Sequence, residues 1–387
     1  MKKKKSQNKK KKLSKKSGML FNKDTNMPSE KYFGKLESVF SFYDAMPTGV
    51  TISEEGRIFV NFPKWGDDVK FTVGEIVGDK LVPYPDLKSN TVDYNDLQNC
   101  FISVQSVVAD GCGTLYVLDT AAPNFSEPIG GGAKLVAVDL KTNKIRRVYT
   151  FSNDVVLPTT YLNDVRFDYR VGKEGYAYIT DSSDKGPGAI IVVDLSDGRA
   201  FRRLNGNLST AADPDFIPKV EGKVMLNRNE DGKTSDVTIG VDGIAISEDG
   251  KKLYYCPLAS RDLYSIETDA LRDESILDSA LCSYVKYLGE KGASDGLITD
   301  AKGTIYAGDY ENNSIRMINK DKVMETILHS PYLLWPDTFT IGCDKYLYVI
   351  ANQLHRQPGY NYGKDLREKP YSLLRVFIDE LPAPTKW

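Results

Sequence analysis

The segments TGVTISEEGRIFV (residues 48–60), QSVVADGCGTLYV (105–117), DGIAISEDGKKLYY (242–255), DGLITDAKGTIYA (295–307) and DTFTIGCDKYLYV (337–349) repeat one pattern along this chain. A sixth copy is split by a short insertion, with NDVRFD at 163–168 and GYAYI at 175–179. Each copy has a polar residue, a short alternating apolar strand, an acidic or glycine-containing turn, and a second strand with an aromatic residue. This pattern is typical of a β-hairpin.

The six copies are about 58 residues apart on average between positions 48 and 337, which predicts one hairpin for each blade of a propeller. Further apolar stretches, such as 189–195 and 200–204, supply the outer strands of the blades. Propellers commonly close by pairing strands from both chain ends, so we expect 35–43 and 371–378 in one sheet. The sequence therefore predicts an all-β, six-bladed propeller at 31–387 after a Lys-rich, disordered tail at 1–30.

The charge of the chain is divided between this tail and the rest. Residues 1–16 hold ten lysines and no acid, which leaves a body of net charge near −12. Such an acidic body argues against specific nucleic-acid binding, whereas the tail is either solvated or in contact with anionic surfaces. Since there is neither an apolar run long enough to span a membrane nor a secretory signal, the expected location is the cytoplasm.

The five cysteines and one long insertion leave alternatives open. No C-x-x-C occurs, so a zinc site is not expected. Cys100 and Cys112 sit on either arm of the second hairpin and are either a bridge or two reduced, packed thiols, depending on the compartment. Residues 204–236 are rich in Asn, Asp, Gly and Pro, and they form either a lid over one channel mouth or a packed surface loop.

The residue that enters the first strand of each blade is expected to face the central channel near one mouth. These residues are Thr48, Gln105, Asn163, Asp242, Asp295 and Asp337. Crowded carboxylates either raise their pKa values or recruit a cation. Asn163, Asp242, Asp295 and Asp337 are therefore a candidate site for Ca²⁺ or another divalent ion, because hard oxygen donors suit calcium. The alternative is a channel filled with water.

Aromatic residues beside this ring are candidates for a ligand pocket. Trp335 precedes Asp337, and Phe62 and Trp65 follow the first hairpin, so they are expected to give the pocket an apolar wall. His355 follows the last hairpin and is expected at the channel rim. Two histidines in the whole chain give poor support to a Ser-His-Asp site, and no fingerprint of a nucleotide cofactor occurs.

Several stretches resemble one family. PTGVTISEEGRIFVNFPKW (47–65), SVQSVVAD (103–110), LYVLDT (115–120), YLNDV (161–165) and PLAS (257–260) are similar to segments of the yellow/major royal jelly protein family. SDGL (294–297) and LWPDT (334–338) are more similar to its microbial branch and to the neighbouring regucalcin/gluconolactonase propellers. The resemblance implies a six-bladed propeller, mostly secreted members, and a cysteine pair at Cys100 and Cys112.

The resemblance also implies what such a protein does. Insect members are tied to pigment formation, to nutritive jelly or to binding of biogenic amines. The gluconolactonase-like enzymes hold a divalent cation with a Glu, an Asn and an Asp. Asn163 and Asp242 match the Asn and the Asp. Thr48 or Gly49 stands where those enzymes have the Glu. Asp295 and Asp337 could replace the negative charge of that missing Glu.

The function expected from these observations is binding of a small molecule at the channel mouth, with Thr48, Gln105, Trp335, His355 and Phe62 as ligand contacts. One alternative is a cation-dependent hydrolase of lactone-like substrates, with Asp295 or Asp337 as the base. Others are a tautomerase of quinone-like compounds and a protein-interaction scaffold.

Overall fold

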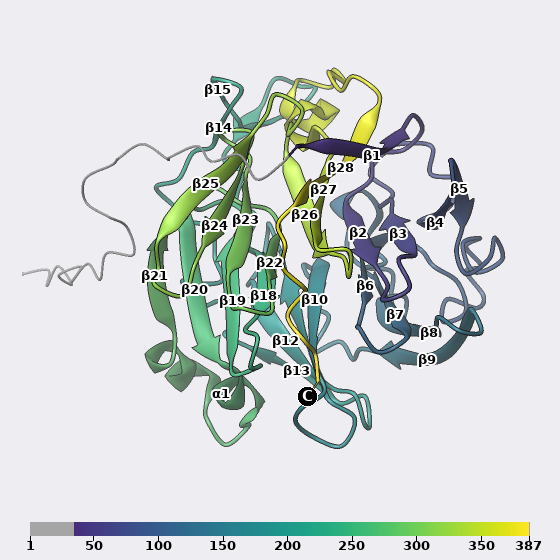
Figure 1. Ribbon diagram of the computed structural model, residues 1–387, viewed down its shortest axis with the longest axis vertical. Helices are drawn as coiled ribbons and strands as arrows, with labels where there is room; N and C mark the ends of the chain where they lie inside the picture. Colours follow the sequence, from purple (N-terminus) through teal and green to yellow (C-terminus); the bar gives the residue numbers. More distant parts are fainter. Residues whose placement is uncertain (1–34, 387) are drawn as a thin grey trace, which may run out of the picture.

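The computed structural model describes residues 35–386, so the predicted tail at 1–30 lies outside the described residues. Six four-stranded antiparallel sheets surround a central channel, which Figure 1 views end on. In this part of the chain the helices are short: α1 (Thr268–Arg272), η1 (Pro123–Phe125), η2 (Asp278–Ser283), η3 (Leu354–Arg356) and η4 (Pro358–Tyr360). The predicted all-β, six-bladed propeller is confirmed.

In each of the first five blades the strands follow chain order from the channel outward. Blade 1 comprises β2 (Gly49–Ile52), β3 (Ile58–Asn61), β4 (Val73–Val77) and β5 (Lys80–Pro83). Blade 2 comprises β6 (Val104–Ala109), β7 (Thr114–Asp119), β8 (Lys134–Asp139) and β9 (Lys144–Thr150). Blade 3 comprises β10 (Leu162–Asp168), β11 (Tyr176–Asp181), β12 (Ala189–Asp194) and β13 (Ala200–Arg203).

Blade 4 comprises β18 (Val241–Ile246), β19 (Lys252–Pro257), β20 (Asp262–Glu267) and β21 (Lys286–Glu290). Blade 5 comprises β22 (Leu297–Thr299), β23 (Ile305–Asp309), β24 (Ser314–Ile318) and β25 (Met324–His329). All six predicted hairpins are therefore the two inner strands of a blade.

Blade 6 joins the two ends of the described chain. Its sheet runs β26 (Pro336–Ile341), β27 (Tyr346–Ala351), β28 (Tyr371–Phe377) and β1 (Glu37–Phe42). Strand β1 pairs antiparallel with β28, with Glu37 opposite Arg375 and Phe42 opposite Tyr371. The closure predicted from both chain ends is confirmed, and it removes the free sheet edges that an open ring of blades would leave.

The core lies between neighbouring blades. One cluster joins Leu118 and Leu135 of blade 2 to Val165 and Ile179 of blade 3, all fully buried. Similar clusters form at the other blade contacts, because alternate residues of each strand point to one face and pack against the next sheet. The channel is thus surrounded by a rigid framework, which holds the first residues of the inner strands in place.

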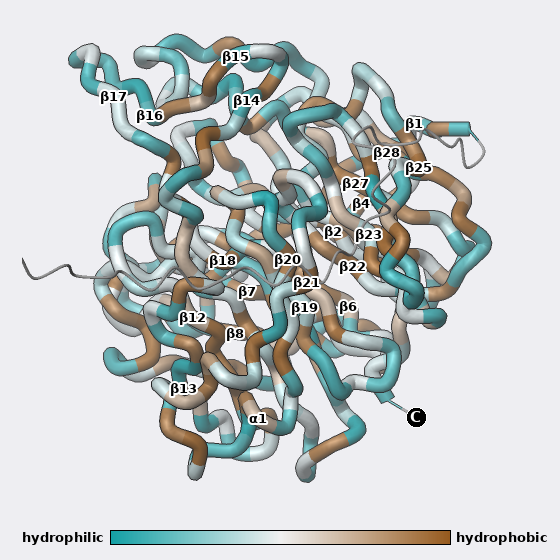
Figure 2. The backbone as a smooth tube through the Cα atoms, turned by 90° about the vertical axis from the view of Figure 1, so that its left-hand side faces the viewer, coloured by the Kyte–Doolittle hydropathy of each residue, from teal (hydrophilic) through white to brown (hydrophobic). Residues whose placement is uncertain are grey.

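Two additions cover opposite ends of the channel. Residues 204–236 form two small hairpins, β14 (Lys219–Val220) with β15 (Lys223–Val224) and β16 (Asn227–Arg228) with β17 (Thr234–Ser235). In Figure 2 they lie at the upper left, and the C terminus projects at the right. In Figure 1 the yellow C-terminal segment crosses the face that is turned toward the viewer.

The cysteines that flank the second hairpin are not bridged. Cys100 is buried and its sulfur accepts the N–H of Asp93 at 3.3 Å, whereas Cys112 lies 3.6 Å from the Thr385 hydroxyl. The two thiols therefore have different neighbours, and of the two alternatives the structure shows packed, free thiols rather than the pair implied by the family resemblance. No helix among the described residues is long and apolar enough to cross a membrane.

Candidate functional site

A small cavity of about 30 Å³ lies at the channel mouth where the inner strands begin. Five of the six lead residues line it, one from each of blades 2 to 6: Gln105, Asn163, Asp242, Asp295 and Asp337. The remaining lining residues include Trp65, Phe125, Tyr161, Ser182, Ile239, Leu258, Leu354, Gln357 and Tyr360. We call this the upper cavity.

The inner strands carry irregularities at the lead residues. The strand register shifts at Gln105 in β6, at Asn163 and Asp164 in β10, at Asp242 in β18 and at Asp337 in β26. A β-bulge of this kind turns a side chain away from the direction that strict alternation would give it. The bulges therefore decide which polar side chains point into the channel.

Glycines let the blades approach one another beside the acids. A Cβ on Gly243 would lie 2.3 Å from the Asp295 carbonyl oxygen, and one on Gly296 would lie 2.4 Å from that of Asp337. The Gly296 N–H donates to the Asp337 carbonyl at 2.9 Å. The Asp-Gly pairs of blades 4 and 5 thus allow the backbones of blades 4, 5 and 6 to lie close together beside the three acids.

The three carboxyls are buried beside one another. Asp242 and Asp295 are close enough to influence each other's pKa. Asp295 also accepts the Trp335 indole N–H at 2.7 Å, and Asp337 accepts the Asn352 amide at 2.5 Å. None of the three forms an ion pair within residues 35–386, so their negative charge is not balanced by a neighbouring cation.

This arrangement favours the protonated acids. Burial, followed by the charge of Asp295, raises the pKa of Asp242 well above its ordinary value. Burial raises the pKa of Asp295 to about 6, against the opposing hydrogen bond from Trp335. Burial and the charge of Asp295 likewise raise the pKa of Asp337. A cation in the cavity would reverse these shifts, because it would stabilise the carboxylate forms.

A cluster of three aromatic rings forms a wall of the same cavity. Phe125 stacks against both Trp65 and Tyr161, with ring centroids 5.0 Å and 4.1 Å away, and the Trp65 and Tyr161 rings lie 6.3 Å apart. The Trp65 indole donates to the Tyr161 hydroxyl at 2.9 Å, which in turn donates to the Gln105 amide oxygen at 2.9 Å. Phe125 adopts φ 53°, a conformation that bulky residues rarely adopt and that often marks functional sites.

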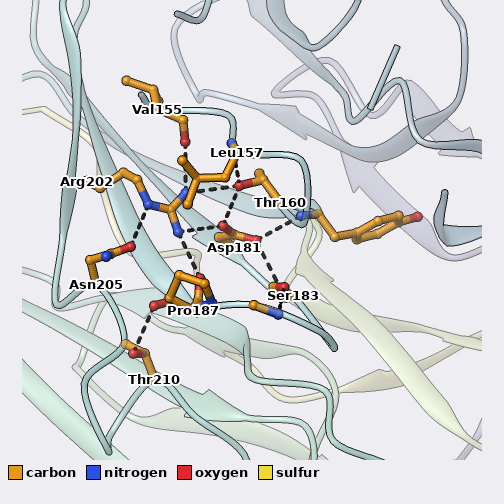
Figure 3. A network of polar contacts seen from close by, with 12 residues as sticks. Val155, Leu157, Thr160, Asp181, Ser183, Pro187, Arg202, Asn205 and Thr210 are labelled. Atoms are coloured by element: carbon orange, nitrogen blue, oxygen red, sulfur yellow. Dashed lines mark hydrogen bonds and ion pairs between the residues drawn. The ribbon is translucent and has the colours of Figure 1, made fainter. Parts of the chain in front are cut away.

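A buried polar network holds Tyr161 in position. Figure 3 shows the carboxylate of Asp181, at the end of β11, with Thr160 and Arg202 around it. Asp181 accepts the Tyr161 N–H at 2.8 Å and the Thr160 hydroxyl at 2.8 Å, and it pairs with Arg202 at 2.7 Å. The loop before β10 is thereby fixed to the end of β11, so the Tyr161 ring keeps its place in the wall.

The upper cavity is closed by the segment after β27, which we call the lid (Leu354–Tyr360). Leu354, Gln357 and Tyr360 line the cavity from this side. The lid is held by Glu221, between β14 and β15, whose carboxylate contacts His355 at 2.7 Å and Arg356 at 2.7 Å. Residues 204–236 therefore do not line the cavity, but they brace the segment that does.

The other predicted ligand contacts lie outside the cavity lining. Thr48 is buried and accepts a hydrogen bond from Asn61 at 2.9 Å. Phe62 packs edge-on against Phe42 and Phe71 in the core. Trp335 stacks on Tyr310 at 4.1 Å and reaches the site only through its hydrogen bond to Asp295.

His355 is also outside the lining of the upper cavity. Its ring contacts Glu221 at 2.7 Å and lies 5.9 Å from the Trp335 ring. Asp164, the residue after Asn163, also lies in the channel, where it lines a cavity at the other end. It pairs with Arg166 at 2.9 Å, below the upper cavity. The bulge in β10 explains this, since it places two consecutive side chains on the channel side.

The donors of the predicted metal site do not gather around one point. Within the described chain, no group of three or more His, Cys, Asp or Glu side chains is placed to hold a metal ion. The Asn163 amide nitrogen donates to Ser182 at 2.8 Å, and the Ser182 hydroxyl lies 3.3 Å from the Asp242 carboxylate. The donor types suit calcium, but the arrangement does not fit one, and calcium binding stays a prediction.

Eight lining residues were not predicted from the sequence, among them Phe125, Tyr161, Ser182 and Tyr360. Ser182 and Tyr161 carry a usable signal, because each adjoins a repeated element, the end of β11 and the start of β10. Phe125 and Tyr360 lie in irregular loops, where no periodic pattern marks them. Only the fold brings them to the channel mouth.

Comparison with known proteins places the chain in a family. The model of the family described as "Major royal jelly protein" matches residues 102–382. The chain belongs to the major royal jelly protein family. The royal jelly family resemblance inferred from segments of the first four blades is thereby confirmed, and the match covers blades 2 to 5 and three of the four strands of blade 6.

Individual members of the royal jelly family are distant in sequence. Major royal jelly protein 1 of Apis mellifera is 24% identical over 342 residues, which is 80% of this chain and 73% of that protein. Protein yellow of Drosophila melanogaster is 28% identical over 265 residues, or 64% of this chain. That alignment spans less than half of the yellow protein, at 46% of its length.

Solved structures share the fold. A luciferin-regenerating enzyme matches with a TM-score of 0.52 and 13% identity, over 91% of this chain and 99% of that chain. XC5397 from Xanthomonas campestris, described as a gluconolactonase, matches with a TM-score of 0.51 and 11% identity, over 89% and 91% of the two chains. At such identities the likeness shows the propeller fold alone.

Proposed function

We propose that this royal jelly family propeller binds a small molecule that carries a positively charged amine on an aromatic or apolar body. The observation that supports this is the pairing of three buried carboxyls, none in an ion pair among the described residues, with a stacked aromatic wall around one cavity. The amine would lie against Asp242, Asp295 and Asp337. The body of the ligand would lie against Trp65, Phe125 and Tyr161.

Electrostatics favour a cation at this position. Each acid keeps a raised pKa because it is buried beside other acids, and an ammonium group would form charge-assisted hydrogen bonds with the ionised carboxylates. The faces of the aromatic rings are also attractive to a cation. A neutral ligand of the same shape would form neither the charge-assisted hydrogen bonds nor the cation–ring contacts. The site is therefore expected to bind charged amines more tightly than neutral analogues.

The size of the cavity requires the lid to move. About 30 Å³ is close to the volume of one water molecule in the liquid, so an aromatic amine can enter only if Leu354, Gln357 and Tyr360 are displaced. Closure over a bound ligand would then exclude water and strengthen the charge interactions. We therefore expect ligand entry through the lid side of the channel.

The test is calorimetric titration with tryptamine and with tryptophol, its neutral alcohol analogue, at pH 7.5. We expect saturable binding of tryptamine and at least tenfold weaker binding of tryptophol. Asp242→Asn should reduce tryptamine affinity at least tenfold, because it removes one of the charges. Asp321→Asn, at an exposed position, is the matched control and should change nothing. Equal affinity for both compounds, or no binding of either, would contradict the proposal.

The second candidate is a cation-dependent hydrolase of lactone-like substrates. Asn163 and Asp242 support it, because Ser182 joins them at the channel mouth. Nothing in the amine proposal depends on a metal ion. Titration with CaCl₂ in the same calorimeter, followed by a thermal unfolding scan, separates the two candidates. Stoichiometric calcium binding that is lost in Asp242→Asn would favour the hydrolase.

A further inference from the structure

A second, larger cavity lies at the opposite end of the channel, where the inner strands end. Its volume is about 440 Å³, within the usual range for small-molecule sites. Most of its lining is apolar and comes from all six blades or the turns beside them, including Val50, Val107, Phe167, Ile246, Ile298 and Ile341. We call this the lower cavity.

The C-terminal segment Leu381–Lys386, which we call the strap, crosses this end and lines the cavity. Its backbone is joined to blade 5, where the Ala301 N–H donates to Leu381 at 2.8 Å and the Ala383 N–H donates to Thr299 at 3.1 Å. Farther along, the Tyr169 N–H donates to Thr385 at 2.8 Å. The strap thus spans from blade 5 to blade 3, and its two prolines keep it extended.

The polar groups of the lower cavity are few. Asp164 and Arg166 pair across 2.9 Å and neutralise one another, and Arg166 also donates to the Leu297 carbonyl at 2.8 Å on the far side of the channel. Arg166 therefore joins blades 3 and 5 in the wall of the lower cavity. Of the other charged lining residues, Glu54 and Lys386 are exposed, and Asp110 accepts the Tyr169 hydroxyl at 2.8 Å.

Some buried polar atoms among the lining residues lack partners. The Thr299 hydroxyl and the Nε of Arg166 make no hydrogen bond in the described chain, although both residues are more than nine-tenths buried. Thr340, which is 8% exposed, adds a further hydroxyl-bearing side chain to the lining. Unsatisfied buried groups are uncommon in folded proteins and often mark a missing water or ligand.

We infer that the lower cavity binds an apolar small molecule with one uncharged hydrogen-bonding group, such as an alcohol or a ketone. The aliphatic lining would contact the apolar part of the ligand. Side chains around an empty cavity lack van der Waals partners on that side, and a ligand would supply them. A neutral group on the ligand would form hydrogen bonds with the hydroxyls in the lining. A charged group would find no unpaired charge of opposite sign, because Asp164 and Arg166 are already paired with each other. This site is independent of the proposed amine site at the other end.

The test uses N-phenyl-1-naphthylamine, a neutral probe whose fluorescence rises in apolar surroundings. Full-length protein should bind one equivalent. Ile298→Phe, which fills the lower cavity, should weaken binding at least tenfold. The same change in the upper cavity, Ile239→Phe, is the matched control and should leave probe affinity within twofold. No saturable signal, or equal affinity in two folded variants, would overturn the inference.

Two further measurements keep the inference testable if Ile298→Phe does not fold. Removal of residues 381–387 deletes the strap and should speed probe release at least tenfold, as measured by stopped-flow displacement. In competition, 1-decanol should displace the probe more effectively than decylamine or decanoate. Unchanged release without the strap would overturn a site beneath it. Preference for either charged competitor would overturn the assignment of a neutral ligand.

Discussion

The two ends of the channel are built by the same six inner strands, yet they have opposite chemistry. The second residue of β18, Asp242, lines the upper cavity and its last residue, Ile246, lines the lower one; Asp337 and Ile341 have the same places in β26. The upper cavity is small, acidic and aromatic, whereas the lower one is large and aliphatic. One strand of six residues can thus supply two unrelated sites, because its two ends reach different mouths.

The two ends also differ in how they are closed. The lid is held by a partly exposed ion pair between Glu221 and Arg356 and by a hydrogen bond between Glu221 and His355, whose pKa is lowered by burial. The strap is held mainly by backbone hydrogen bonds from Ala301, Ala383 and Tyr169. Charge contacts of the first kind are weak and sensitive to salt. We therefore expect the lid to open more readily than the strap.

The largest expected effect on stability comes from removing the Asp164–Arg166 ion pair in the wall of the lower cavity. Arg166→Met should lower the free energy of unfolding by roughly 3–5 kcal/mol, because it leaves Asp164 buried without its partner. Urea denaturation followed by tryptophan fluorescence measures this. The double variant with Asp164→Asn should recover most of the loss. If Arg166→Met is as stable as the wild type, the Asp164–Arg166 ion pair does not contribute to the free energy of unfolding.

An intermediate effect is expected from pH, and only at the upper end. Burial raises the pKa of Asp295 to about 6 from an ordinary 3.8, so the folded protein holds a proton that the unfolded chain has released. Stability should therefore be highest below pH 4 for this group and fall as pH rises toward 6, by roughly 3 kcal/mol at most.

The measurement is urea denaturation at pH 4.5 and at pH 7.5 for the wild type and Asp295→Asn. The variant should lose less stability over this interval, since it has no proton to release at that position. Thr340→Val, in the lower cavity, serves as the control and should follow the wild type. A wild type and an Asp295→Asn variant with parallel pH profiles would contradict the raised pKa.

The smallest expected effect concerns the lid. Glu221→Gln should cost about 1 kcal/mol or less in stability, because the contact is partly exposed, but it should speed tryptamine association severalfold in stopped-flow fluorescence. Glu75→Gln removes a comparable contact with Arg57 in blade 1, away from the lid, and should leave the rate unchanged. Slower or unchanged association in Glu221→Gln would mean that this contact does not hold the lid.

Much of the fold could be predicted because it is periodic. The six hairpins, the outer strands and the pairing of 35–43 with 371–378 all follow from alternation and spacing, which are local properties of a strand. The lead positions of the inner strands also follow, since they come first in each repeat. The amide of Gln105 and the carboxyls of Asp242, Asp295 and Asp337 were placed near one mouth for this reason.

Other parts of the site could not be predicted, because they depend on departures from that period. The bulge in β10 turns Asp164 into the channel, against strict alternation. Phe62 and Trp335 pack into the core rather than the cavity, whereas Trp65 reaches the wall. An aromatic side chain beside a strand end has several buried places available, and only its three-dimensional neighbours decide among them.

The sequence by itself determined the number of blades, their closure and the ring of polar lead residues, because each depends on contacts between neighbours in a repeating strand. Only the tertiary structure decided which side chains meet: the wall of Trp65, Phe125 and Tyr161, the lid braced by Glu221, and the cavity beneath the strap. These contacts join segments far apart along the chain, and their geometry is set by bulges and loops that no local pattern encodes.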